Sequence, residues 1–317
     1  MTGGPSFQLA LYPGLTAKAQ IQTSRTCPIC YGCRAKGDIA MDNPSYPLGH
    51  SEHELERLNT QARYVEPVTR RFFREAGVKA GMRVLDVGSG AGDVAFLAAD
   101  LVGDAGEVIG ADQVATAVAI ATQRAKAKGL RNVSFRVGDP SELEFDRPFD
   151  AVVGRYVLVF QADAAAMVRK LAKHLSPGGV IVFHEPDWSD VRSFPPAPTY
   201  DACCQWVIEA ARRAGAECNG ATNLYRAFLG AGLPAPQMRM QTFIGFGVTC
   251  TDWLQTLADF ACTTGTMLPK IEQFGLTRAA EVDVVTLAQR LRDEVIANAH
   301  MIVGRSEIAA WSRRGAS

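Results

Sequence analysis

The stretch that decides the fold of this chain is residues 84–92, which read VLDVGSGAG. Its first half is an apolar run typical of a buried β-strand, and its second half places three glycines before the helical pattern of residues 93–101. Glycine lets the backbone turn tightly and lets a ligand approach without a Cβ in the way. Amide groups at the start of the next helix favour an anionic group. The pattern predicts a strand, a ligand-binding turn and a helix.

Outward from this turn, apolar runs and helical patterns alternate along the chain. This alternation predicts an α/β fold with a mostly parallel, Rossmann-like sheet and helices on both faces. The predicted strands are residues 83–87, 107–111, 133–137, 151–154 and 180–183, and the predicted helices are 93–101, 114–128 and 163–175.

The flanking regions follow other patterns. Residues 1–50 are predicted to be an irregular extension, and residues 51–76 a helix that opens the main domain, which we place at 51–250. Helices are predicted at 200–214 and 221–230, and a strand at 237–246. The helical patterns at 251–267 and 279–297 are too long for a hairpin loop, so residues 251–298 are predicted to be an inserted helical cap. A last strand at 301–303, within 299–317, returns to the main domain.

Asp112 ends the second predicted strand, 20 residues after Gly92. A carboxylate there can accept hydrogen bonds from both hydroxyls of a ribose. The dinucleotide fingerprint G-x-G-x-x-G fits less well, because the third glycine comes one position early and Asp93 stands in its place. Since an acid after the second strand suits either ligand, Asp112 alone does not discriminate between them.

Five segments in order resemble the motifs of class I S-adenosylmethionine-dependent methyltransferases. Residues 84–92 resemble the first motif, and Asp112 stands at the position of the ribose-binding acid. Residues 138–140 resemble the adenine-binding segment, residues 149–155 the fourth-strand motif, and residues 175–179 the hairpin before strand five. The sequence of these segments is similar to that of the ubiquinone/menaquinone C-methyltransferase branch and its small-molecule relatives.

The resemblance implies a seven-stranded sheet with one antiparallel strand, and S-adenosylmethionine as the cofactor. Asp86 matches the position that holds the cofactor's amino end or the glycine loop. Tyr64, from the first helix, is expected either to close over the cofactor or to pack as a half-buried aromatic. The predicted cofactor contacts are Tyr64, Asp86, Gly88, Ser89, Gly90, Asp112, Gln113, Gly138, Asp139, Pro140 and Arg155.

The candidate catalytic residues are His184 and Glu185, which directly follow the fifth predicted strand, where open α/β sheets bind ligands. A sulfonium methyl is strongly electrophilic, so a base is needed only if the acceptor carries a proton that must leave. His184 could be that base because its ordinary pKa is near neutral, or it could position a loop. Glu185 could bind substrate or accept the proton.

Composition narrows the function further. Lys+Arg and Asp+Glu both number 33, without the basic surplus typical of nucleic-acid-binding proteins. No apolar run is long enough to span a bilayer, and the N-terminus lacks a secretory pattern, so a cytoplasmic protein is predicted. The eight cysteines are then expected to be reduced thiols.

Three cysteines lie close together in the N-terminal extension: Cys27, Cys30 and Cys33. They could contribute to a zinc site with His50 or His53, or to an iron–sulfur cluster, but we favour incidental cysteines and predict no metal. Met41 is a candidate for the natural start, because the composition changes near it.

The sequence predicts methyl transfer to a small, apolar or aromatic metabolite, at a carbon, oxygen or nitrogen acceptor. A macromolecule methyltransferase is one alternative, although the Asn/Asp-Pro-Pro-Tyr/Phe motif of base amino-group methylation is absent after strand four. A protein that binds the cofactor without methyl transfer is the other. The sequence leaves the substrate and the oligomeric state open.

Overall fold

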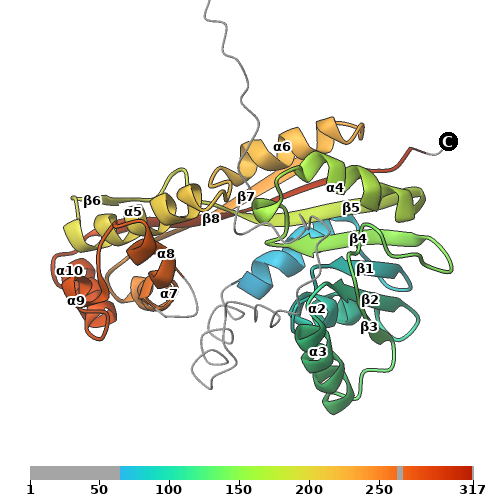
Figure 1. Ribbon diagram of the computed structural model, residues 1–317, viewed down its shortest axis with the longest axis horizontal. Helices are drawn as coiled ribbons and strands as arrows, with labels where there is room; N and C mark the ends of the chain where they lie inside the picture. Colours follow the sequence, from blue (N-terminus) through green and yellow to red (C-terminus); the bar gives the residue numbers. More distant parts are fainter. Residues whose placement is uncertain (1–64, 263–266, 316–317) are drawn as a thin grey trace, which may run out of the picture.

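The computed structural model describes residues 65–262 and 267–315 (Figure 1). The predictions for Tyr64, for the cysteines of residues 27–33, for His50 and His53, for a start at Met41 and for the extension of residues 1–50 lie outside the described residues. The described part of the predicted first helix is helical over residues 65–76.

The first half of the described chain alternates strands and helices as predicted. The helix predicted over residues 163–175 is shorter than expected. A 3-10 turn, Ala172–His174, follows Leu171, and Leu175 already pairs with Phe149 in the sheet. The elements are β1 (Arg83–Val87), α2 (Asp93–Val102), β2 (Glu107–Asp112), α3 (Ala115–Ala127), β3 (Val133–Val137), β4 (Phe149–Arg155), α4 (Ala164–Leu171) and β5 (Leu175–Asp187).

The second half adds α5 (Pro198–Arg213), α6 (Gly220–Gly230) and three strands, β6 (Arg192–Phe194), β7 (Gln237–Phe246) and β8 (Met301–Arg313). The strand order is β3-β2-β1-β4-β5-β8-β6, and β7 pairs with the other edge of β8. Strands β1 to β5 are parallel, and β8 runs antiparallel to β5, β6 and β7. The sheet has eight strands rather than seven; the addition is the three-residue β6, which continues the edge of β8 beyond the end of β5.

The last strand was predicted at 301–303, and this was too short. β8 continues to Arg313 and is buried along nearly all of its length between β5 and β7. The predicted strand ended at residue 303 because the charged residues Arg305 and Glu307 interrupt the apolar run. These two charges pair with each other inside the protein, which lets a strand that contains them be buried.

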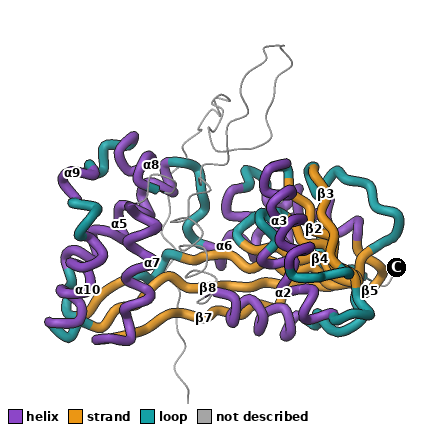
Figure 2. The backbone as a smooth tube through the Cα atoms, turned by 90° about the horizontal axis from the view of Figure 1, so that it is seen from below, coloured by secondary structure: helices purple, strands orange, loops and turns teal. Residues whose placement is uncertain are grey.

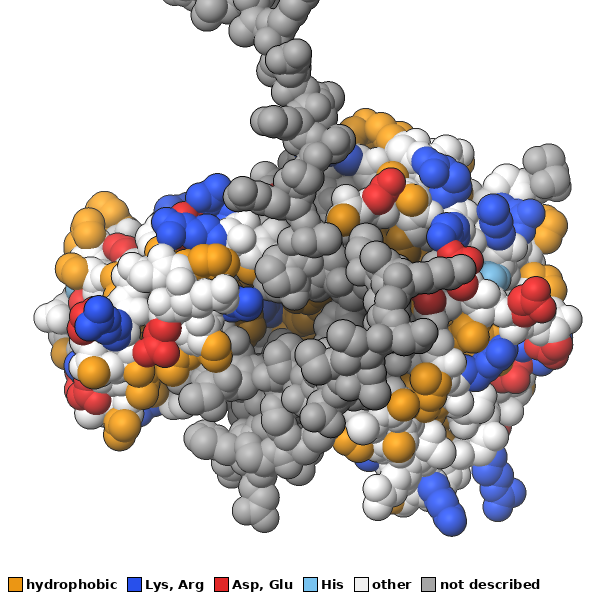
Figure 3. Space-filling view, viewed as in Figure 1, with side chains coloured by type: hydrophobic (Ala, Val, Ile, Leu, Met, Phe, Trp, Pro, Cys, Tyr) orange, Lys and Arg blue, Asp and Glu red, His pale blue; other side chains and the backbone are white. Residues whose placement is uncertain are grey.

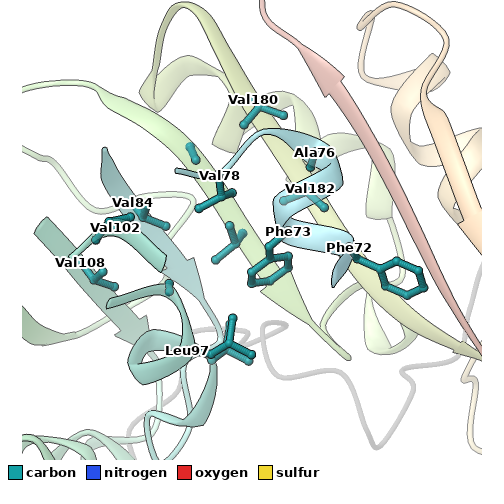
Figure 4. Close-up of a cluster of buried hydrophobic side chains, with 14 of the residues drawn as sticks. Phe72, Phe73, Ala76, Val78, Val84, Leu97, Val102, Val108, Val180 and Val182 are labelled. Atoms are coloured by element: carbon teal, nitrogen blue, oxygen red, sulfur yellow. The ribbon is translucent and has the colours of Figure 1, made fainter. Parts of the chain in front are cut away.

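Two hydrophobic cores cover the two faces of the sheet. On one face, the helix of residues 65–76 and α2 pack Phe72, Phe73 and Leu97 against strand residues such as Val84 and Val182 (Figure 4). On the other face, α4 and α6 pack around a second core with Phe149, Phe183 and Phe228. Parallel strands buried on both faces read as continuous apolar runs, which is why the sequence predicts them well.

A third core forms a separate lobe at the far end of β7 and β8 (Figures 1 and 2). It contains Trp253 and Leu254 of α7 (Thr251–Cys262) and Leu291 of α10 (Leu287–Ala297), and also Tyr200 of α5. We call this unit the cap lobe. Two short helices complete it, α8 (Leu268–Gln273) and α9 (Ala279–Val282).

The predicted helix over 279–297 is interrupted. Asp283 follows α9 with a φ of 50°, and the next helix begins only at Leu287. A non-glycine residue in the left-handed region ends a helix, and here the Asp283 carboxylate accepts a hydrogen bond from the Thr286 hydroxyl at 2.6 Å. Within the described residues, none of the helices has the length and apolar character needed to cross a bilayer.

Candidate functional site

The glycine turn after β1 adopts backbone angles that favour glycine. The φ values are 65° at Gly88, 50° at Gly90 and 95° at Gly92, all in the left-handed region. A Cβ on Gly88 would lie 3.0 Å from a methyl group of Val157, so the turn also packs closely against the segment after β4. The backbone conformation therefore favours glycine at all three positions, and close packing adds to this at Gly88 and Gly92 but not at Gly90.

Asp112 at the end of β2 fixes this turn to the next helix. Its carboxylate accepts hydrogen bonds from the amides of Gly90 at 2.9 Å and Val114 at 2.8 Å. The turn is also tied to β2 by the amides of Gly88 and Ser89, which donate to the carbonyl of Ala111 at 2.9 and 3.1 Å. Because each carboxylate oxygen can accept a further bond, Asp112 is held rigidly and keeps acceptor capacity for a ligand.

Two buried polar side chains at the turn have no hydrogen-bond partner among the described residues. Asp86 is 1% exposed and Ser89 is 6% exposed, and both Asp86 oxygens and the Ser89 hydroxyl are unpaired there. Burial raises the pKa of Asp86 well above its ordinary value, although the Arg155 guanidinium opposes this shift. Buried polar groups are rarely left unpaired in proteins, so these atoms point to a missing ligand.

The predicted adenine segment lies beside the same edge of the sheet. The amide of Gly138 donates to the carbonyl of Asp112 at 2.9 Å, and the Asp139 carboxylate accepts from the Ser141 amide at 2.8 Å. Pro140 is buried and Gln113 is exposed. The structure thus brings the predicted cofactor residues of β1, β2 and β3 to one edge, and Arg155 joins them at the end of β4.

His184 on β5 is buried completely and uses both ring nitrogens inside the protein. Nε2 lies 2.8 Å from the Glu307 carboxylate, and Nδ1 lies 3.0 Å from the Thr69 hydroxyl. Since a carboxylate only accepts, Nε2 carries the hydrogen of the first bond. Burial lowers the pKa of His184, although Glu307 favours the charged form.

Glu307 on β8 joins three elements through one carboxylate. Its Oε2 accepts from His184 and, at 2.8 Å, from the hydroxyl of Tyr156, while its Oε1 accepts from Nε of Arg305 at 3.0 Å. Burial alone would raise the pKa of Glu307, but the charge of Arg305 and the bond from His184 lower it to about 2. Glu307 is therefore a buried anion with a full set of donors.

Tyr156 is the strained member of this network. Its φ is 59°, a backbone conformation uncommon for residues other than glycine, and its hydroxyl also accepts from Arg305 at 2.8 Å. Burial raises the pKa of the phenol well above its ordinary value, so the group stays protonated and donates to Glu307. Strain beside a buried charge network is typical of functional sites.

Glu185, the second candidate base, holds the turn that follows Tyr156. One of its oxygens accepts from the amides of Val157 at 2.9 Å and Leu158 at 2.8 Å, and the other from Val159 at 3.2 Å. It is fully buried. Because Val157 also packs against Gly88, Glu185 supports the glycine turn indirectly.

A pH dependence of stability follows from this arrangement. Burial raises the pKa of Glu185 from 4.5 to about 7, against the effect of the three amides. A carboxyl whose pKa is higher in the folded than in the unfolded state stabilises the protein while it is protonated. As the pH rises from about 4.5 to 7, the free energy of unfolding therefore falls by about 3 kcal/mol in all. Wild-type protein should therefore lose stability relative to Glu185→Gln over this interval, measured by urea unfolding at several pH values. Parallel curves for the two proteins would contradict the assignment.

Sequence reasoning missed Glu307, Arg305 and Thr69. Glu307 lies 123 residues from His184, so no local pattern connects them. One signal was available: Arg305 and Glu307 stand two positions apart in an otherwise strand-like segment, where opposite charges on one face can compensate each other.

The fold and the turn define an α/β domain in which the predicted cofactor residues lie together at the carboxyl ends of β1, β2, β3 and β4. Residues 78–224 match the family model described as a methyltransferase domain. This part of the chain is a methyltransferase domain of the class I S-adenosylmethionine-dependent type, as the sequence motifs predicted.

Several curated relatives share this part of the chain. Aklanonic acid methyltransferase of Streptomyces sp. strain C5 is 36% identical over 137 residues, which cover 43% of this chain and 61% of the relative. Arsenite methyltransferase of Aquipseudomonas alcaligenes is 37% identical over 113 residues, 33% of each chain. The ubiquinone/menaquinone C-methyltransferase of Cellvibrio japonicus is 35% identical over 123 residues, 37% of this chain and 49% of the relative. The chain thus spans less than two thirds of each of these three relatives.

Proposed function

We propose that this protein transfers the methyl group of S-adenosylmethionine to a small-molecule metabolite. The observation that carries the proposal is the pair of unpaired buried groups, Asp86 and Ser89, directly beside the rigidly held Asp112. A ligand with a ribose and charged ends would supply the partners that these atoms lack. The names of the relatives support a small acceptor: they are methyltransferases of aklanonic acid, of arsenite and of ubiquinone/menaquinone biosynthesis.

The residues at the site fit this cofactor. The glycine turn of residues 88–92 leaves backbone open to a ligand, Asp112 could accept from the ribose hydroxyls, and Asp139 could accept from the adenine amino group. Asp86 and the nearby cation of Arg155 offer a complementary pair to the ammonium and carboxylate of the methionine part. When bound, the cofactor supplies an electrophilic methyl group, and the chain has to orient the acceptor and exclude water.

The contacts of the two candidate bases favour positioning roles. His184 has both nitrogens occupied by Thr69 and Glu307, and Glu185 accepts three amides, so neither has a free atom directed at a substrate within the described structure. We infer that His184 and Glu307 hold Tyr156, and that Glu185 holds the turn behind it. The proposal therefore favours the second of the two roles that the sequence left open for His184, that of positioning a loop.

The finer points of the proposal rest on composition and on the relatives. Among the described residues, Cys204, Cys218 and Cys250 are in no disulfide, which is consistent with action in the reducing cytoplasm. The accepting atom stays open among carbon, oxygen and nitrogen. A macromolecule methyltransferase and a non-transferring binding protein remain the two alternatives.

Turnover separates these alternatives. Purified protein is incubated with methyl-labelled S-adenosylmethionine and, in parallel, with a small-molecule extract, with RNA and with total protein. We expect label to enter the small-molecule fraction and S-adenosylhomocysteine to form in equal amount. Label in RNA or protein would support the macromolecule alternative, and cofactor binding without transfer in any fraction would support the binding protein.

Asp86→Asn should separate binding from folding. The buried carboxylate has no described partner, so removing its charge should raise the free energy of unfolding without ligand by about 1 kcal/mol or more. The same change should weaken S-adenosylhomocysteine binding about tenfold, because it removes the carboxylate that we propose pairs with the ammonium group of the ligand. Thermal unfolding and calorimetric titration measure the two effects. A variant that is less stable and binds normally would show that Asp86 serves the fold alone.

A further inference from the structure

The glycine turn has a second tie, which comes from Arg124 in the last turn of α3. Nη1 of Arg124 donates to the carbonyl of Ala91 at 2.6 Å, and Nη2 donates at 2.7 Å to the Asp93 carboxylate in the first turn of α2. The donors of a guanidinium stand in a rigid planar fork, so one side chain holds both acceptors in a fixed geometry. Arg124 therefore joins α3 to the turn and to the start of the helix that follows it.

An aromatic ring holds the guanidinium of Arg124 in place. The guanidinium carbon lies 5.3 Å from the centroid of the Phe96 ring, which packs edge to face against Phe135 of β3 with the ring centroids 6.0 Å apart. A cation over an aromatic ring is attracted by the negative face of the ring. A Cβ on Gly92 would lie 2.7 Å from the Phe96 ring, so the ring that orients Arg124 also packs against the turn.

The cations that follow Arg124 face solvent instead. Lys126 and Lys128 are exposed, whereas only 34% of the Arg124 side chain is exposed. Lys and Arg side chains project from the lower edge of the molecule in Figure 3, near the end of α3 in the same view of Figure 1. The inward contacts of Arg124 distinguish it from these surface cations.

The bonds within the turn fix two of its peptide groups and leave the one between them open. In the peptide between Ser89 and Gly90, the carbonyl accepts from the Gly92 amide at 2.8 Å, and the amide donates to the carboxylate at the end of β2 at 2.9 Å. In the peptide between Ala91 and Gly92, the carbonyl accepts from Arg124 and the amide is the donor just named. Within residues 65–262 and 267–315, the peptide between Gly90 and Ala91 has no hydrogen bond at either end.

We propose that Arg124 is a positioning residue for S-adenosylmethionine, which fixes the Ala91–Gly92 peptide group so that the open Gly90–Ala91 peptide group meets the cofactor in the correct orientation. The inference rests on the proposed function, because it takes this cofactor as the ligand of the turn. A turn that already has its bound geometry does not have to be ordered when the ligand arrives, and this raises affinity. A residue that only packed α3 against α2 would have no such effect on binding.

Arg124→Met tests the proposal, because the variant keeps an apolar stem beside Phe96 and loses both donors. We expect the dissociation constant for S-adenosylhomocysteine, measured by calorimetric titration of the full chain, to rise about tenfold. The unfolding midpoint without ligand should stay within about 3 °C of the wild type, because a partly exposed ion pair contributes little to stability.

Arg124→Ala adds a readout that helix packing alone would not change. Deleting the side chain at this partly exposed position gives a small guanidinium ion access to Ala91 and Asp93. Ethylguanidinium at millimolar concentration should strengthen S-adenosylhomocysteine binding by this variant several-fold. Ethylammonium, which has the same charge but no planar fork, should not.

Lys128→Met is the matched control, because it removes one positive charge at the end of α3 and the ammonium that lies 5.7 Å from the centroid of the same Phe96 ring. It should bind S-adenosylhomocysteine like the wild type. Arg124 variants that bind like the wild type, an equal loss in Lys128→Met, or weak binding that ethylguanidinium does not improve would each overturn the proposal. A folded wild-type protein that binds no S-adenosylhomocysteine would overturn the proposed cofactor as well.

Discussion

Replacing Asp112 with alanine is expected to weaken binding of S-adenosylhomocysteine by about 100-fold or more. We propose that the charged carboxylate accepts hydrogen bonds from two ribose hydroxyls, and hydrogen bonds to charged groups contribute roughly 1.5–3 kcal/mol each. The change also removes the acceptor for the amides of Gly90 and Val114, so the glycine turn loses its tie to the start of α3. Calorimetric titration of both proteins measures the effect.

Asp104→Ala is the matched control for this experiment. Asp104 is exposed before β2, at the opposite end of the strand from Asp112, and its removal changes the net charge by the same amount. It should bind like the wild type. Equal binding by wild type and Asp112→Ala would show that the carboxylate serves the turn alone, and a folded wild type that binds no S-adenosylhomocysteine would count against the proposed cofactor itself.

The sequence predicted the parts of the fold that depend on local patterns. The apolar runs of residues 83–87 and 107–111 are buried parallel strands, and the glycines that follow β1 have the positive φ values that such a turn requires. It did not predict the full length of β8 or the interruption at Asp283. Both depend on partners distant in sequence or on a single residue's backbone angle, which periodicity does not report.

In the candidate site, too, the sequence predicted the residues that local spacing defines and missed the contacts between distant segments. Asp112 could be found because its spacing from the glycine turn follows from the length of one helix and one strand. The environment of His184 could not, because Thr69, Tyr156 and Glu307 come from three distant segments of the chain. Sequence position suggested a base beside the cofactor, whereas the contacts describe a residue locked between two partners.

Glu307→Gln should cost about 3–5 kcal/mol of stability, because it removes the negative charge that pairs with the buried guanidinium of Arg305. For a chain of this size, that lowers the unfolding midpoint by about 10 °C. Only the ionised carboxyl of Glu307 stabilises the protein in this way. Because its pKa is about 2 in the folded protein and ordinarily 4.5, its full contribution to the free energy of unfolding is present above pH 4.5. The difference in the free energy of unfolding between the wild type and Glu307→Gln should therefore become smaller as the pH falls from 4.5 towards 2.

Glu209→Gln is the control that isolates burial as the cause. Hydrogen bonds from Arg212 and Arg213 lower the pKa of Glu209 to about 2 as well, but this carboxyl lies at the surface of α5. Solvent can replace those partners, so the variant should unfold within about 2 °C of the wild type, since exposed ion pairs contribute little. Equal losses in the two variants would mean that Arg305 is hydrated in solution, and the closed network around Tyr156 would then be wrong.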